Sequence, residues 1–376
     1  MPLGRVTGEK NVSVESTPML SVVLPVYNEE ALLEDNLILI RDYLRSIESE
    51  FRWEIVIVND GSADKSGPIV RQFAEKNEHV VALTHPRNFG LGQALKYGMA
   101  NTRGDYVITL DIDLSYDVEH IGELARKIRD DKARLVLASP YMKGGSISNV
   151  PGLRRMLSIL GNRFLRFFVQ GHFSTLTSIV RAYDGPYIRA MNLRAQGMDV
   201  MPEVVYKSMI LRAAIDEVPA RLDWGPQLQY QNRRSSMRLV RHVFSTVMSG
   251  FLFRPFLFFV FPGILLAIFS LYVIFWMGFH VFESYEFLKT AGEIADPSSA
   301  LAHAYKAYPH TYIVGLLSTM LSIQLIGLGI VSLQNKRYYE ELFHLGSTVL
   351  RHEMAGNRDA IHTKNCEPPM SNAGSE

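Results

Sequence analysis

Two long stretches in the C-terminal half of the sequence contain no Asp, Glu, Lys or Arg. One runs from Phe256 to Phe282, 27 residues, and the other from Thr311 to Leu333, 23 residues. Crossing a bilayer as a helix takes about 20 predominantly apolar residues. A soluble amphipathic helix of this length keeps a polar face, which both stretches lack. The pattern therefore predicts two transmembrane helices and disfavours a pair of buried helices in a soluble core.

Basic residues flank this predicted hairpin on its outer sides. Lys336 and Arg337 follow the second stretch, whereas the connecting loop, 283–310, carries only Lys289 and Lys306. The first stretch is preceded by Arg233, Arg234, Arg238, Arg241 and Arg254. By the positive-inside rule, both termini are expected in the cytoplasm and the loop outside. The first 18 residues contain no apolar run of signal-peptide length, so we expect the N-terminal part to remain cytoplasmic as well.

A basic amphipathic segment precedes the first predicted span. Residues 233–255 interleave arginines with Phe, Val and Leu, a pattern typical of helices that lie at anionic lipid headgroups. We expect a flexible tail at 1–18, a globular domain at 19–232, an interface helix at 233–255, transmembrane helices at 256–282 and 311–333, an external loop at 283–310 and a cytoplasmic tail at 334–376. Homo-oligomers formed through the hairpin are a further expectation.

Short apolar runs alternate with amphipathic segments between Leu20 and Ala220. Between the first two runs, apolar residues recur at helical spacing from Leu32 to Ile47, and Asn28 is expected to cap that helix. The runs are rich in β-branched residues and end in polar turns, as strands do; they cover 20–26, 53–58, 80–84, 106–110 and 134–138. This alternation predicts an α/β domain with a Rossmann-like, mainly parallel, doubly wound sheet.

Polar residues gather where the predicted strands end. Asn28 and Glu29 follow the first strand, Asp60 follows the second, and Asp111 and Asp113 follow the fourth. In such sheets ligands bind at the carboxyl ends of the strands. Two carboxylates at i and i+2 leaving a strand point to the same side, where they can hold a hard divalent cation that also binds phosphate. No GxGxxG or P-loop follows the first strand, which disfavours a dinucleotide oxidoreductase or an NTPase.

The charge balance excludes further classes of protein. Lys and Arg total 39 against 38 Asp and Glu, so no excess basic field exists for coating nucleic acid, and we expect no nucleic-acid partner. The single cysteine, Cys366, rules out an intramolecular disulfide and a zinc or iron–sulfur site built from cysteines.

Several motifs, taken in order, resemble the family-2 glycosyltransferases with the GT-A fold. Within that family the chain is most similar to the dolichol- or polyprenyl-phosphate hexosyltransferases, some of which also carry two C-terminal spans. The motifs that carry the resemblance are Pro25-Val26-Tyr27-Asn28-Glu29-Glu30, Asn59-Asp60-Gly61-Ser62, Arg87-Asn88-Phe89-Gly90, Asp111-Ile112-Asp113, Glu203 and Glu217-Val218-Pro219.

The resemblance implies a site for a nucleotide-sugar donor. Asp60 would hold the base or ribose, and Asp111 and Asp113 would hold Mg²⁺ or Mn²⁺ against the donor pyrophosphate. The implied donor-binding residues are Pro25, Tyr27, Asn28, Glu29, Asp60, Asp111, Ile112 and Asp113. Structural alternatives stay open at this point: Tyr27 covering a sheet edge, Asp60 capping a turn, and either Asp111 or Asp113 as a solvated loop acid.

The candidate residues for binding or activating the acceptor are arginines, one serine and one glutamate. Arginine is suited to bidentate phosphate binding, and Arg233, Arg234, Ser235 and Arg238 stand where the membrane is expected to meet the domain. Plain positive-inside charge is the alternative for these residues, and Arg181 is a weaker candidate for the same phosphate. For a hydroxyl acceptor, Glu203 would be the general base; its alternative is structural bonding to a loop backbone.

Together these features predict an inverting, metal-dependent hexosyltransferase. It would move a hexose from a GDP- or UDP-linked sugar to a polyprenyl phosphate, dolichyl or undecaprenyl, at the cytoplasmic membrane face. Two other interpretations stay open: a glycolipid-forming transferase that uses a lipid hydroxyl, and a non-enzymatic sugar-nucleotide sensor or scaffold. The paired Asp111 and Asp113 disfavour the scaffold, which needs no cation site.

Overall fold

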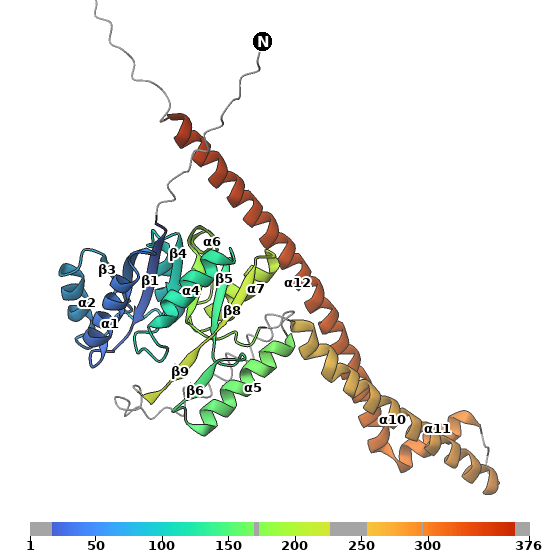
Figure 1. Cartoon of the computed structure of the whole chain (residues 1–376). Coiled ribbons are helices and arrows are strands. Elements are labelled where there is room, and N and C mark those ends of the chain that lie inside the picture. The colour runs from blue at the N-terminus through green and yellow to red at the C-terminus, as the bar shows by residue number, and fades with distance from the viewer. Residues whose placement is uncertain (1–16, 169–172, 226–253, 293, 295, 365–376) are drawn as a thin grey trace, which may run out of the picture. The chain divides into compact units, whose positions relative to one another are not determined.

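The computed structural model describes residues 17–168, 173–225, 254–292, 294 and 296–364. These residues fall into two compact units. The first contains residues 17–166 and 173–225, and the second contains 167–168, 254–292, 294 and 296–364. Figure 1 shows the first unit as a sheet with helices and the second as long helices.

The first unit is built on a seven-stranded sheet with the order β3-β2-β1-β4-β7-β5-β8. Only β7 is antiparallel to its neighbours, so the sheet is mainly parallel, as predicted. All five predicted strands are present. The strands are β1 (Met19–Val26), β2 (Arg52–Asn59), β3 (Val80–Thr84), β4 (Tyr106–Thr109), β5 (Leu135–Ser139), β7 (Arg181–Asp184) and β8 (Ile215–Pro219). A second, two-stranded sheet pairs β6 (Ser146–Ser148) with β9 (Arg221–Asp223).

Helices cover both faces of the large sheet because alternate strand residues point to opposite sides. Along β1, Leu20, Val22 and Leu24 share one core with side chains of α1, α2 and α4, whereas Val23 faces α3 near Gly98. The helices of this unit are α1 (Leu33–Ser46), α2 (Ser66–Glu75), α3 (Leu91–Ala100), α4 (Glu119–Asp130), α5 (Gly152–Phe168), α6 (Gly185–Arg189) and α7 (Val200–Ile210). The predicted α/β fold class is therefore confirmed.

The start of α1 differs from the sequence prediction. Asn28 was expected to cap this helix, but α1 begins at Leu33 and its N-cap residue, Leu32, makes no side-chain cap. The Asn28 amide oxygen instead accepts the N–H of Ala63 at 2.8 Å, in the turn after β2. Asn28 thereby joins two loops that are far apart in the sequence.

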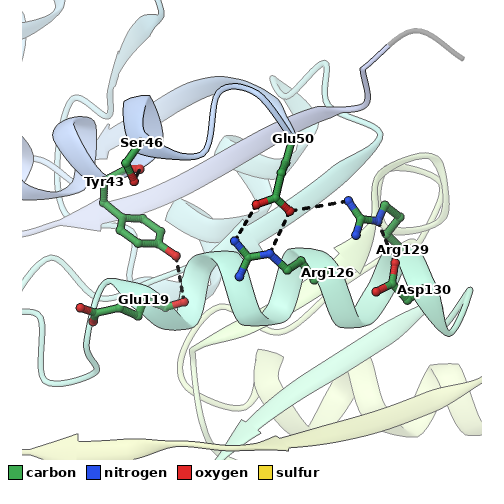
Figure 2. A network of polar contacts seen from close by, with 7 residues as sticks. All are labelled: Tyr43, Ser46, Glu50, Glu119, Arg126, Arg129 and Asp130. Atoms are coloured by element: carbon green, nitrogen blue, oxygen red, sulfur yellow. Dashed lines mark hydrogen bonds and ion pairs between the residues drawn. The ribbon is translucent and has the colours of Figure 1, made fainter. Parts of the chain in front are cut away.

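A polar network ties the turn after α1 to α4 (Figure 2). Glu50 accepts two hydrogen bonds from the Arg126 guanidinium, at 2.9 and 2.8 Å, and Arg129 lies 3.9 Å from the same carboxylate. The hydrogen bond from Arg126 lowers the pKa of Glu50. The Tyr43 hydroxyl donates to the carbonyl of Glu119 at 3.2 Å. These partly exposed contacts fix the two helices side by side on one face of the sheet.

The second unit consists of α10 (Pro255–Thr290), α11 (Pro297–Ala307) and α12 (Pro309–Lys364). Two stretches within them are long and apolar enough to cross a membrane, Phe256–Thr290 and Pro309–Gly346. Both extend beyond the ranges predicted from the uncharged runs. The segment expected as an external loop, 283–310, contains the end of α10 and all of α11. A capping box formed by Asp296 and Ser299 starts α11.

Small residues let α10 and α12 pack closely. A Cβ atom added to Gly263 would lie 2.9 Å from Ile326, and one added to Gly329 would lie 2.4 Å from Val260. The hydroxyls of Ser270 and Thr319 are 2.5 Å apart across the two helices. Close backbone approach and interhelical hydroxyl bonds are how helices associate in lipid, where water supplies no hydrophobic driving force.

Candidate active site

A cleft of about 420 Å³ opens at the carboxyl ends of β1, β2 and β4. These three strands are neighbours in the sheet, so the polar residues that follow them meet at one edge. The cleft is lined by Pro25, Val26, Tyr27, Glu29, Asp60, Asn88, Gly90, Leu91, Ala94, Asp111, Ile112, Asp113 and Met198. All the predicted donor-binding residues except Asn28 line this cleft.

The turn after β1 is held in place by the loop after β2. The backbone N–H of Asn28 donates to Ser62, and that of Glu29 donates to Ser66, each at 3.0 Å. Asn28 itself has a positive φ of 56°. In this geometry Tyr27, 43 % exposed, lines the cleft, where a planar ligand can stack on its ring.

Asp60 anchors the loop formed by residues 85–90. Its Oδ1 accepts from His85 Nδ1 at 2.7 Å and from the Phe89 N–H at 3.0 Å, and its Oδ2 accepts from the Gly90 N–H at 2.8 Å. The carboxylate is thus fully used in shaping the 85–90 loop, which brings Asn88 and Gly90 into the cleft. Asp60 therefore does not merely cap its own turn, because its hydrogen bonds go to a different loop.

His85 supports the site through Asp60, without lining the cleft, and the sequence did not indicate it. Its ring stacks on Tyr97 with centroids 5.1 Å apart and meets the Phe89 ring edge-on, also at 5.1 Å. The ring is therefore held from two sides while its Nδ1 donates to Asp60. Scattered histidines carry no spacing signal, so only the fold could reveal this one.

The two aspartates after β4 lie together in the cleft with Glu29. The tight turn that carries them includes Leu114 at φ 48°, and the Ser115 N–H donates to Asp113 Oδ1 at 2.9 Å. Burial, followed by the negative charges of Asp113 and Glu29, raises the pKa of Asp111 well above its usual range. A cation at this position would relieve the repulsion among the three carboxylates.

The carboxylates of Asp111 and Asp113 suit a divalent cation whose remaining coordination sites are filled by phosphate and water. Among the described residues, no group of three or more His, Cys, Asp or Glu side chains is arranged to hold a metal by itself. Mg²⁺ is commonly held by one or two carboxylates, with water and substrate phosphates completing the octahedron. Asp111 and Asp113 provide that pair, and the cleft leaves room for a pyrophosphate beside them.

Glu203 does not line the cleft. It is 7 % exposed, and its carboxylate accepts the backbone N–H groups of Arg194 (2.9 and 3.1 Å) and Ala195 (2.8 Å) while pairing with Lys207 at 2.5 Å. Hydrogen bonds of this kind favour the structural alternative, loop anchoring, over a general base that must reach a substrate proton.

Arg181 is also unsuited to its predicted role. The side chain is fully buried, and its guanidinium donates to the carbonyls of Ser178 and Met201 at 2.7 Å and of Leu176 at 2.8 Å. Burial lowers the pKa of this arginine. The assignment of Arg181 to an acceptor phosphate is therefore corrected: it is a core residue that ties carbonyls of two segments together. The other acceptor candidates, Arg233, Arg234, Ser235 and Arg238, lie outside the described residues.

A comparison with protein families matches residues 21–189 to Glycosyl transferase family 2. This part of the chain is similar to family-2 glycosyltransferase domains. It contains β1 to β5, β7 and α6, and it supplies every residue that lines the cleft except Met198. The resemblance inferred from the sequence motifs is confirmed.

Curated relatives of this glycosyltransferase domain carry names that refer to lipid phosphates. Dolichyl-phosphate beta-glucosyltransferase ALG5C of Trichomonas vaginalis is 31% identical over 145 residues, covering 36% of this chain and 43% of the relative. Undecaprenyl-phosphate 4-deoxy-4-formamido-L-arabinose transferase of Shewanella sediminis is 30% identical over 178 residues, covering 47% of this chain and 51% of the relative. The chain thus spans about half the length, or less, of these relatives.

Among solved structures, glucosyl-3-phosphoglycerate synthase from Mycobacterium tuberculosis, in complex with Mn²⁺, UDP and glucosyl-3-phosphoglycerate, is similar to this chain with a TM-score of 0.45. The two are 20% identical, and the match covers 62% of this chain and 80% of the synthase.

Proposed function

We propose that this protein is an inverting, metal-dependent glycosyltransferase that moves a hexose from a nucleotide sugar to a polyprenyl phosphate. The observation that carries the proposal is the Asp111–Asp113 pair beside Glu29, in a cleft at the carboxyl edge of a family-2 glycosyltransferase domain. The lipid phosphates in the names of the curated relatives support the acceptor class.

The donor would bind across the cleft. Tyr27 offers an exposed aromatic side chain for the nucleoside base, and the 85–90 loop held by Asp60 contributes Asn88 and Gly90 to the same cleft. Asp111 and Asp113 would hold Mg²⁺ or Mn²⁺ against the pyrophosphate. When bound, the cation would neutralise the negative charge that develops on the leaving nucleoside diphosphate. The sugar would then face acceptor molecules that approach the open side of the cleft.

A phosphate acceptor needs no general base. Its second pKa is about 6, so at neutral pH it is largely a dianion and already a nucleophile. Orientation of the two bound reactants can supply about 7–11 kcal/mol of barrier reduction. The engaged carboxylate of Glu203 is compatible with such a mechanism, since no proton has to be removed. Positive charge is required instead, and we assign it to Arg233, Arg234 and Arg238, with Ser235 between them in the sequence.

The acceptor class can be tested by measuring nucleotide release from UDP- and GDP-sugars by the full chain in detergent with Mn²⁺. We expect release with a polyprenyl monophosphate and none above background with diacylglycerol. Release with diacylglycerol alone would replace the proposal with a glycolipid-forming transferase. Release with neither lipid, for every donor tried, would favour a sugar-nucleotide sensor.

We also propose that α10 and α12 span the membrane with both termini in the cytoplasm. Many of their apolar side chains point outward, among them Phe261, Leu271 and Leu316, which are 63 %, 66 % and 71 % exposed. Lipid contact would remove the cost of exposing these side chains to water. The basic flanks set the orientation.

Ser298, exposed near the start of α11, gives a test of this topology. In a Cys366→Ser background, Ser298→Cys should react with a membrane-impermeant maleimide added outside intact cells. The unaltered protein, whose only cysteine is Cys366, should react only after the membrane is permeabilised. The reverse pattern would invert the proposed topology.

A further inference from the structure

The segment that follows α6 lies against the donor cleft although it contains no regular secondary structure. Residues 192–198, the sequence Asn-Leu-Arg-Ala-Gln-Gly-Met, precede α7, and the last of them, Met198, lines the cleft. Segments of this kind usually cover the surface and vary in position. This one is held by hydrogen bonds from two helices, α7 and α3.

One set of contacts comes from α7. Glu203 and Lys207 are one helical turn apart and both are buried, at 7 % and 2 % exposure. The Glu203 carboxylate accepts the N–H groups of Arg194 and Ala195, and the Lys207 ammonium donates to Glu203 and to the carbonyl of Asn192. A buried ion pair persists only where hydrogen bonds satisfy its remaining atoms. Here the backbone of the segment supplies those bonds.

A second set comes from α3. The Gly92 N–H donates to the carbonyl of Gln196 at 2.8 Å, and Lys96 donates to the carbonyls of Leu193 and Arg194, each at 3.4 Å. The backbones are packed so closely that a Cβ atom on Gly92 would lie 2.6 Å from the Gln196 carbonyl carbon. The segment is therefore pressed onto the first turn of α3.

We propose that residues 192–198 form a fixed wall of the nucleotide site, with Glu203 as the positioning residue that holds it and Met198 as the side chain it presents to the nucleoside diphosphate of the donor. The proposal rests on the proposed function. It follows from the two sets of contacts, because they fix the segment between α7 and the start of α3, where Gly90 and Leu91 also line the cleft. Met198 adds a flexible, polarisable thioether to this part of the lining.

The test measures binding of UDP and GDP to the full chain in detergent with Mn²⁺, by calorimetry and without acceptor. Met198→Ala should lower the affinity for whichever nucleotide binds more tightly about tenfold, which corresponds to about 1.4 kcal/mol of lost contact. Met156→Ala, at an exposed position on α5, is the matched control and should leave the affinity unchanged. An unchanged affinity for folded Met198→Ala would overturn the assignment of Met198.

Glu203→Gln tests the positioning role, because an amide can accept fewer of the backbone N–H bonds and leaves Lys207 without a counter-charge. We expect nucleotide affinity to fall about tenfold while the pH profile of kcat keeps its shape. Glu48→Gln, at an exposed position after α1, is the control. A general base would give the opposite result, unchanged nucleotide affinity with kcat lowered about 10²- to 10⁴-fold, and that would overturn the positioning role.

Gly92→Ala provides a variant that alters no charge, in case Glu203→Gln does not fold. The added methyl group would displace Gln196 from α3, and nucleotide affinity should again fall. Normal affinity in this variant would overturn the fixed wall. A wild-type protein that binds UDP or GDP but transfers sugar to no lipid would contradict the proposed function alone and leave this inference standing.

Discussion

Replacing Asp113 by Asn is expected to reduce sugar transfer about 10²- to 10³-fold while the fold stays intact, an effect of the size seen when preorganised charge stabilisation is removed. The substitution keeps the size of the side chain and lets its amide oxygen still accept the N–H of Ser115. It removes one of the two negative charges proposed to hold the cation against the pyrophosphate. The cation would then bind weakly, and the leaving nucleotide would lose its counter-charge.

The measurement is nucleotide release with saturating donor and polyprenyl phosphate, with thermal unfolding as the check on folding. Asp42→Asn, at an exposed position on α1, is the matched control and should keep full activity. Transfer by the wild-type protein should stop in EDTA and return with added Mn²⁺. Wild-type rates that persist in EDTA would contradict the metal assignment, whatever the variant does.

The large sheet could be predicted because its strands are buried on both faces. Continuous apolar runs such as 55–58 and 135–138 are typical of strands buried in a parallel sheet. β7 was not predicted, since Arg181–Asp184 is a short strand with one charged residue at each end and no clear alternation. Its antiparallel pairing with β4 and β5 is decided by contacts between distant segments, which a local pattern does not record.

The donor side of the site could be predicted for a related reason. Asp60 and Asp111 are about fifty residues apart in the sequence, but parallel strands bring their carboxyl ends to the same edge. The residue types and the topology were therefore enough to place them in one cleft. The sequence pattern did not predict the hydrogen-bond partners of each side chain. An example is Asp60, which makes three hydrogen bonds to the 85–90 loop.

The residues whose expected roles changed share one property. Asn28, Arg181 and Glu203 are all polar residues in a motif that suits ligand binding, and each is used by backbone groups of another segment. Hydrogen-bonding capacity looks the same in a sequence whether a ligand or a loop takes it up. For Arg181 and Glu203 burial decides between the two, because a buried polar group has to find its partners within the protein, whereas Asn28 is only partly buried.

Gly61→Ala should have the second large effect, because it displaces the 85–90 loop at the cleft without changing any charge. Gly61 has a positive φ of 65°, and a Cβ atom there would lie 2.2 Å from the carbonyl carbon of Arg87 and 2.6 Å from the backbone nitrogen of Asn88. The left-handed conformation alone costs a residue with a Cβ atom about 1–2 kcal/mol. The overlap with backbone atoms comes on top of that cost.

Relief of this overlap requires the 85–90 loop to move away from the strand end. Asp60 would then lose its bonds to Phe89 and Gly90, and Asn88 would leave the cleft. We expect UDP or GDP affinity to fall about a hundredfold, equivalent to about 2.7 kcal/mol, with a lower melting temperature. Gly152→Ala is the matched control, because a Cβ atom there meets nothing within 4 Å. Wild-type affinity and stability in Gly61→Ala would mean that the 85–90 loop adapts freely. Asp60 would then not shape the nucleotide site by fixing this loop.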